Sequence, residues 1–325
     1  MKKILLSIVF FFLFSSVGYA GPCLTTIASA STNQLACADD DILKVTSAGS
    51  ITYSDNKAVD LEDISGVQIT NDGTIQTESG TNKQIAINAE SSLNTTITNN
   101  GTINSDNKYG VILSYAENVV ITNNAGATIS ADGNTAIYGK NVGNCHFNGT
   151  NCHSDLSGQS NGVGLTLHNH GTITSQHETV WLGSGASGNH RSKGIKIYNY
   201  DGGIIKTTDE GDSPIKGFHL VDFEFINYQG GTIESADRHA VNTEQSEDIN
   251  FTNHGTITAT DKSAFYCKTC SDVTFNNTGT MTSGNNAVVI SAGDNISITN
   301  SGTITATADN SGLNISSSDG TVVTN

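Results

Sequence analysis

A seven-residue motif returns along almost the whole chain and limits the folds that this sequence can adopt. It consists of an apolar residue, any residue, Asn, a short polar step, Gly, Thr and Ile. Clear copies are ITNDGTI at Ile69, ITNNGTI at Ile97, FTNHGTI at Phe251 and ITNSGTI at Ile298. Looser copies begin at Val45, Ile121, Leu167, Ile197, Phe225 and Phe275. Such a repeat is the sequence mark of a solenoid, in which each unit buries its apolar face only by stacking on its neighbours.

The residue that closes each motif shows how long one repeat is. Successive closing residues are 23 to 32 positions apart, except for one interval of 44 between Ile129 and Ile173. They are Ile51, Ile75, Ile103, Ile129, Ile173, Ile205, Ile233, Ile257, Met281 and Ile304. A nearly constant period in the twenties predicts about ten stacked coils.

The segments between the motifs indicate strands. The runs QIAIN (84–88), GVILS (110–114) and NAVVIS (286–291) are rich in apolar and β-branched residues and are bounded by Gly, Asn, Asp and Ser. This is the composition of strands and turns, and beyond the N-terminal segment no window carries a helical apolar stripe. We therefore predict an all-β chain that folds as a right-handed parallel β-helix (solenoid), each coil reading strand, turn, strand, turn, strand.

The motif also predicts which residues stack. The Asn side chains are expected to form one hydrogen-bonded column at a corner, as in other in-register β assemblies. This column comprises Asn71, Asn99, Asn169, Asn227, Asn253 and Asn300, and an interior column beside it comprises Ile75, Ile103, Ile173, Ile233, Ile257 and Ile304. The Gly after each Asn is expected to supply a positive φ at the corner.

Composition agrees with a thin, one-dimensional core. Of 325 residues only 36% are hydrophobic and 6% aromatic, which is little for a large globular core. The formal net charge of −16 argues against nucleic acid as a partner.

The N-terminus is expected to be processed. Residues 1–20 combine Lys2 and Lys3, an apolar stretch and small residues near Ala20, which is the pattern of a secretory signal peptide. The apolar stretch is too short to span a membrane as a helix. We predict an N-terminal cap over residues 21–43 and the β-helix over residues 44–325.

Six cysteines lie in three close pairs. These are Cys23 with Cys37, Cys145 with Cys152, and Cys267 with Cys270. In an exported protein, an even number of locally paired cysteines predicts disulfides. A zinc site remains an alternative for the middle pair, where Cys145, His146, Cys152 and His153 lie close together in the sequence. The Cys267–Cys270 spacing is that of redox motifs, but it lacks their strand–helix context, so a structural staple is favoured and no metal or cofactor is predicted.

No catalytic constellation emerges from the sequence. A polysaccharide lyase or hydrolase would need Asp or Glu together with Lys or Arg at matching places on adjacent coils, and the sequence does not establish such a cluster. GDSP (211–214) has only a faint similarity to a serine nucleophile region. The remaining candidates follow the repeat and are interpreted as stack or surface residues; they are His168, His170, His254, Trp181, Tyr198, Tyr200 and Tyr228.

A signal peptide followed by N-x-G-T-I coils resembles the passenger region of bacterial autotransporters, the secreted part of type V secretion proteins. The resemblance covers residues 44–325 and implies a β-helix displayed outside a Gram-negative cell. It further implies a non-catalytic adhesin or stalk, at the cell surface or outer membrane or secreted. The expected partner is a glycan or protein on a host or neighbouring cell. A β-helical polysaccharide lyase or hydrolase is the second hypothesis, and a purely structural spacer the third.

The last five residues, TVVTN, repeat the opening of the motif. Together with the resemblance, this predicts that the full-length chain continues with further coils and an outer-membrane translocator barrel.

Overall fold

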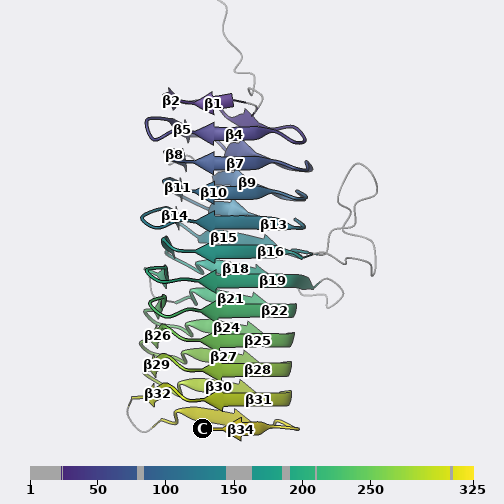
Figure 1. Cartoon of the computed structure of the whole chain (residues 1–325), viewed down its shortest axis with the longest axis vertical. Helices are drawn as coiled ribbons and strands as arrows, with labels where there is room; N and C mark the ends of the chain where they lie inside the picture. The colour runs from purple at the N-terminus through teal and green to yellow at the C-terminus, as the bar shows by residue number, and fades with distance from the viewer. Residues whose placement is uncertain are drawn as a thin grey trace, which may run out of the picture.

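The computed structural model describes residue 23 and residues 25–78, 84–143, 163–184, 191–208, 211–307 and 310–325. Over these ranges the chain is a parallel β-solenoid of three sheets, with one coil stacked on the next from purple to yellow (Figure 1). The described residues contain no helix, and therefore none that is long and apolar enough to cross a membrane. The predicted signal peptide lies outside the described residues.

The first sheet has 12 parallel strands, most of which end at the motif Asn. Equivalent residues of successive coils pair directly, so that Ile97 lies between Ile69 and Ile121. The strands are β1 (Thr25–Ile27), β4 (Ile42–Val45), β7 (Gln68–Asn71), β10 (Thr96–Asn99), β13 (Val119–Asn123), β16 (Leu165–Asn169), β19 (Ser192–Asn199), β22 (Leu220–Asn227), β25 (Glu247–Asn253), β28 (Ser271–Asn277), β31 (Asp294–Asn300) and β34 (Val322–Thr324).

The second sheet has 11 strands and carries the closing residue of each motif. Ile75 pairs with Ile51 and Ile103, and the same register continues to Met281 and Ile304, which confirms the predicted interior column. The strands are β2 (Ala30–Ser31), β5 (Ser50–Tyr53), β8 (Thr74–Thr77), β11 (Thr102–Ser105), β14 (Thr128–Ala131), β17 (Thr172–Ser175), β20 (Ile204–Thr207), β23 (Thr232–Ser235), β26 (Thr256–Ala259), β29 (Thr280–Ser283) and β32 (Thr303–Ala306).

The third sheet also has 11 strands and contains the apolar runs between the motifs. The strands are β3 (Leu35–Ala36), β6 (Lys57–Asp60), β9 (Ile85–Asn88), β12 (Tyr109–Ile112), β15 (Thr135–Lys140), β18 (Val180–Gly183), β21 (Ile215–Phe218), β24 (Val241–Glu244), β27 (Phe265–Lys268), β30 (Val288–Ser291) and β33 (Leu313–Ser316). Because β1, β2 and β3 pair with the next strand of each sheet, residues 25–36 within the predicted cap form a first coil.

Asparagine side chains form a continuous ladder at the corner between the first and second sheets. In each rung the Nδ2 group of one Asn donates to the Oδ1 atom of the next, over 2.7 to 2.9 Å. The ladder contains the six predicted residues and also Asn123, Asn199, Asn277 and Asn325, in the order Asn71, Asn99, Asn123, Asn169, Asn199, Asn227, Asn253, Asn277, Asn300, Asn325. The predicted column is therefore confirmed.

The reason predicted for the motif glycine is wrong. Positive φ occurs at Gly126, Gly202 and Gly230, where the motif is longer, and not at the glycine of compact motifs such as Gly255. A Cβ atom on Gly255 would instead lie 2.5 Å from the carbonyl oxygen of Tyr228 in the preceding coil. Glycine is needed here because the backbones of successive coils approach too closely for a side chain.

The corner from the third sheet to the next coil uses positive φ at residues other than glycine. His219, Gln245, Thr269 and Ala292 occupy equivalent positions with φ between 52° and 56°. Sequence patterns did not predict this corner, because such φ values are uncommon for side chains like these.

Two of the three predicted disulfides are present in the described residues. Cys267 bonds to Cys270 across Thr269, and Cys23 bonds to Cys37 in the first coil. Cys145 and Cys152, with the alternative zinc ligands beside them, lie outside the described residues.

Candidate binding groove on the third sheet

A groove of about 570 Å³ crosses the outer face of the third sheet over strands β6, β9, β12 and β15. Its lining residues come from four neighbouring coils and from the turns beside them. They are Asn56, Lys57, Glu62, Ile85, Glu90, Lys108, Tyr109, Ile112, Ser114, Tyr115, Tyr138 and Lys140. The inward-facing residues of the same strands, such as Ile87 and Val111, are fully buried, so the groove floor rests on the packed core.

The floor of the groove carries a row of equivalent residues. The strand register aligns Asn88 with Ile112, Ile112 with Tyr138, and Tyr138 with Trp181. Tyr138 stacks on Trp181 with 4.8 Å between ring centroids and on Tyr109 with 4.5 Å. Because Tyr138 is stacked on both sides, mainly the edge of its ring is left for a ligand. Trp181 is a stacked residue, which is one of the two roles predicted for it.

One wall of the groove is a second row, formed by Glu62, Glu90, Ser114 and Lys140. Backbone hydrogen bonds fix this alignment: Asp63 N donates to Glu90 O, Ser91 N to Ser114 O, and Tyr115 N to Lys140 O. Adjacent members are therefore about one strand spacing apart, roughly 4.8 Å.

This wall is a cluster that sequence reasoning missed. It places two carboxylates and a lysine at matching positions of nearby coils, which is the arrangement that a polysaccharide lyase or hydrolase would need. The four wall residues share a backbone feature, because each immediately precedes a residue with positive φ: Asp63, Ser91, Tyr115 and Asn141. These four residues are of different types, so the shared feature is seen only in the folded chain.

Charges at one end of the groove compensate each other. Lys57 Nζ lies 3.3 Å from Asp60 Oδ1 and also forms a close ion pair with Glu62. Burial alone would lower the pKa of the Lys57 ammonium group, but the two carboxylates raise it overall. Asn88 Nδ2 donates to Asp60 Oδ1 over 2.7 Å, while the buried Asn88 Oδ1 atom has no partner among the described residues.

Two groups on the groove favour their protonated forms. The pKa of Glu90 is raised, first by burial and then by the neighbouring charge of Glu62, with Lys57 opposing the shift. Burial, together with Tyr138, raises the pKa of Tyr109 to about 12. The ammonium of Lys108 lies 4.9 Å from the Tyr109 ring centroid. The groove thus offers carboxylate acceptors, ammonium donors, aromatic edges and apolar side chains, a mixture typical of small-molecule and sugar sites.

The other aromatic and histidine candidates lie on the first sheet and at the corner where its strands end. His170 stacks on Tyr200 with 4.1 Å between centroids, and Tyr200 stacks on Tyr228 with 4.8 Å. His168 stacks on Tyr198, and His254 contacts Thr278 in the row that continues from Tyr228. These contacts agree with the prediction that the residues follow the repeat.

The GDSP segment offers no exposed nucleophile. Ser213 is buried, with 4% of its surface accessible. Asp212 Oδ2 pairs with His177 Nδ1 over 2.9 Å, which ties this turn to the preceding coil.

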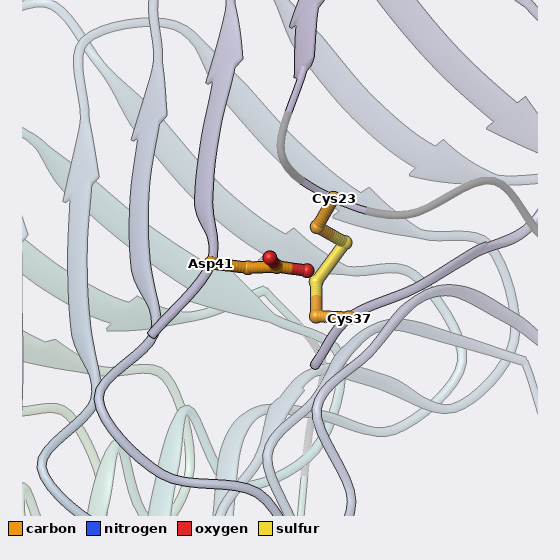
Figure 2. A group of neighbouring side chains, drawn as sticks. All are labelled: Cys23, Cys37 and Asp41. Atoms are coloured by element: carbon orange, nitrogen blue, oxygen red, sulfur yellow. A yellow bond between two sulfur atoms is a disulfide. The ribbon is translucent and has the colours of Figure 1, made fainter. Parts of the chain in front are cut away.

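Cys23, Cys37 and Asp41 are close enough to suggest a metal site (Figure 2). One potential ligand atom of each lies within 4.8 Å of the others. However, the two sulfur atoms are bonded to each other, and metal binding requires thiolates. Asp41 accepts a hydrogen bond of 2.8 Å from Ala38 N, so this cluster is accounted for by the fold of the first coil.

No protein-family model, curated protein or solved structure matches this chain. What the structure itself establishes is a parallel β-solenoid of three sheets with a lateral groove and local disulfides.

Proposed function

We propose that this protein is an exported, surface-displayed binding module, an adhesin-like passenger that is non-catalytic and holds its partner in the groove on the third sheet. The observation that carries the proposal is the groove itself, which combines lysines and aromatic edges, mostly on four neighbouring strands, with carboxylates on the turns that follow two of them. Binding residues on strands are held more precisely than residues on loops. The autotransporter-like motif and the local disulfides support export to an oxidising environment.

A second candidate function is cleavage of a polysaccharide, and one observation favours it. The wall row places Glu90, whose pKa is raised, beside Glu62 on the adjacent coil. A carboxyl group that keeps its proton can act as a general acid, and glycoside hydrolases pair such an acid with a second carboxylate. Lys140 in the same row could neutralise an acidic sugar in a lyase.

Binding assays on the purified, disulfide-bonded chain test the leading proposal. Tyr138→Ala removes the central ring of the groove floor and is expected to weaken binding to cells or matrix glycans about tenfold, the loss of a typical interaction hot spot. Tyr266→Ala is the matched control, because Tyr266 lies in the same strand register but outside the groove, and it should retain binding.

The same samples separate the alternatives. Release of sugar products that stops in Glu90→Gln would contradict the non-catalytic assignment and favour the enzyme. Equal binding by Tyr138→Ala, Tyr266→Ala and the parent chain would contradict a role for this groove. No binding to any surface would leave the spacer hypothesis.

A further inference from the structure

We infer that the groove recognises a linear polysaccharide rich in uronic acids, with the sugar chain lying parallel to the solenoid axis. This inference rests on the proposed binding function and specifies its ligand class.

The floor row and the wall row of the groove indicate how the sugar chain is oriented. Both the floor row and the wall row run from coil to coil, and the groove extends along the axis over strands β6 to β15. Chemical groups therefore recur at about the spacing of parallel strands, roughly 4.8 Å. A ligand that also repeats along its length can contact several coils at once, whereas a compact molecule would use only one or two.

The acidic character follows from the lysines. Lys57 is already neutralised by Asp60 and Glu62, but Lys140 forms no ion pair within the described residues. It lies on the wall of the groove, two coils beyond Glu90. In a protein with a net charge of −16, an ammonium group in a groove that has no carboxylate partner among the described residues is a specific place for an anion. A sugar carboxylate would supply that partner.

The sugar character follows from the remaining lining. Glu62 and Glu90 can accept hydrogen bonds from hydroxyl groups, and the edges of Tyr109 and Tyr138 with Ile112 offer apolar contact to sugar C–H groups. A uronic acid carries hydroxyl groups, C–H faces and a carboxylate. These match the carboxylate acceptors, the aromatic and apolar side chains, and the Lys140 ammonium group of the groove.

The test compares polygalacturonate with its fully methyl-esterified form in titration calorimetry. The two polymers share one backbone, and only the first carries negative charge. The parent chain is expected to bind polygalacturonate at least about tenfold more tightly, the usual value of one charge-assisted hydrogen bond. Lys140→Ala should lose most of this preference. Lys268→Ala should keep it, because Lys268 occupies the same register position outside the groove.

Three results would overturn the inference. They are equal binding of both polymers, an unchanged preference in Lys140→Ala, and tighter binding of dextran sulfate, which would indicate non-specific attraction to charge density. Circular dichroism of each variant ensures that a loss of binding is not a loss of fold. If polygalacturonate fails but Tyr138 is still needed for binding to cells, the ligand class is wrong and the binding function stands. If neither polymer nor cells bind, both proposals fail.

Discussion

At the scale of single residues, the Asn ladder explains why this motif can be repeated so often. A buried amide is costly unless its donor and acceptor are both used. Asn253 meets this requirement on both sides, because its Oδ1 atom accepts from Asn227 over 2.9 Å and its Nδ2 group donates to Asn277 over 2.8 Å. Each Asn is thus satisfied by the next coil, so a single position contributes to the stability of three coils.

Asn253→Ala is therefore expected to destabilise the chain by about 2–4 kcal/mol. The substitution leaves the buried Asn277 Oδ1 atom without the donor from Asn253, at about 1–3 kcal/mol, and removes one hydrogen bond of Asn227 Nδ2, at about 1 kcal/mol. The Nδ2 group of Asn227 still donates to Gly231 O and Thr256 O. Chemical denaturation followed by circular dichroism measures the shift in midpoint. Asn250→Ala in the same strand is the control, since Asn250 is exposed and should change stability by less than about 0.5 kcal/mol. Equal effects of both variants would show that the ladder is not stabilising.

His239 is expected to make the protein less stable in acid. Burial, with smaller effects of Lys262 and Arg238, lowers the pKa of His239 to about 4. Its Nδ1 atom accepts a hydrogen bond of 3.1 Å from Ser263 N, and its ring stacks on Tyr266. Because the unfolded chain has a pKa near 6.5 at this group, it binds more protons than the folded chain between about pH 6.5 and 4. Stability should therefore fall as the pH decreases through this window.

The size of this effect is at most about 3 kcal/mol, from 1.36 kcal/mol for each pKa unit. Denaturation midpoints measured across the window for the parent chain and His239→Gln provide the test. The variant should have a flatter profile, because it has no imidazole to protonate. Parallel profiles for the two proteins would assign the acid sensitivity to other groups.

At the scale of elements, every strand is too short to be stable alone, and its position is set by the strands on either side. The interior columns show how this register is held. Ile69, Ile97 and Ile121 occupy one column of the first sheet, which continues through β22, β25 and β28 as Phe225, Phe251 and Phe275. Phe251 stacks between the other two rings, with centroid distances of 5.0 and 4.9 Å.

Phe251→Ala is expected to cost about 3–5 kcal/mol, because it opens a cavity in a fully buried stack. Phe251→Ile introduces the residue that other coils carry at this position and should cost clearly less. Hydrogen exchange measured on both variants should show the loss of protection centred on β22, β25 and β28. Uniform loss along the whole chain would instead indicate that the solenoid unfolds as one cooperative unit.

At the scale of the whole molecule, the solenoid turns a one-dimensional repeat into long rows on its surface. Each coil contacts its neighbours, so the free energy of unfolding is approximately a sum of local terms. A change of sequence in one coil therefore has little effect on distant coils. This tolerance allows the coils from β6 to β15 to carry lysines and tyrosines on the third sheet, and carboxylates on the adjoining turns, while the interior columns of these coils remain aliphatic. A binding groove spread over four coils is consistent with this division between interior and surface.

The architecture could be predicted from the sequence alone. The period of the N-x-G-T-I motif predicts about ten coils, the Asn ladder and the interior column from Ile75 to Ile304, and all of these are present in the structure. The physical reason is that these features depend on contacts between equivalent positions of consecutive repeats, which can be aligned by counting residues. The disulfides Cys23–Cys37 and Cys267–Cys270 were predictable for a similar reason, because their partners are close in the chain.

The role of the motif glycine and the composition of the groove depend on contacts between coils, and they could not be predicted from the sequence. Gly255 is required by the carbonyl oxygen of Tyr228, a contact between backbones of different coils that leaves no pattern in local φ preferences. Glu62, Glu90 and Lys140 have no shared motif and are separated by turns of unequal length, so their alignment depends on the register of the third sheet. Because the repeats differ in length, members of such a surface row are separated by unequal numbers of residues in the sequence. The extra residues of each coil lie in its turns, while the strands stay in register.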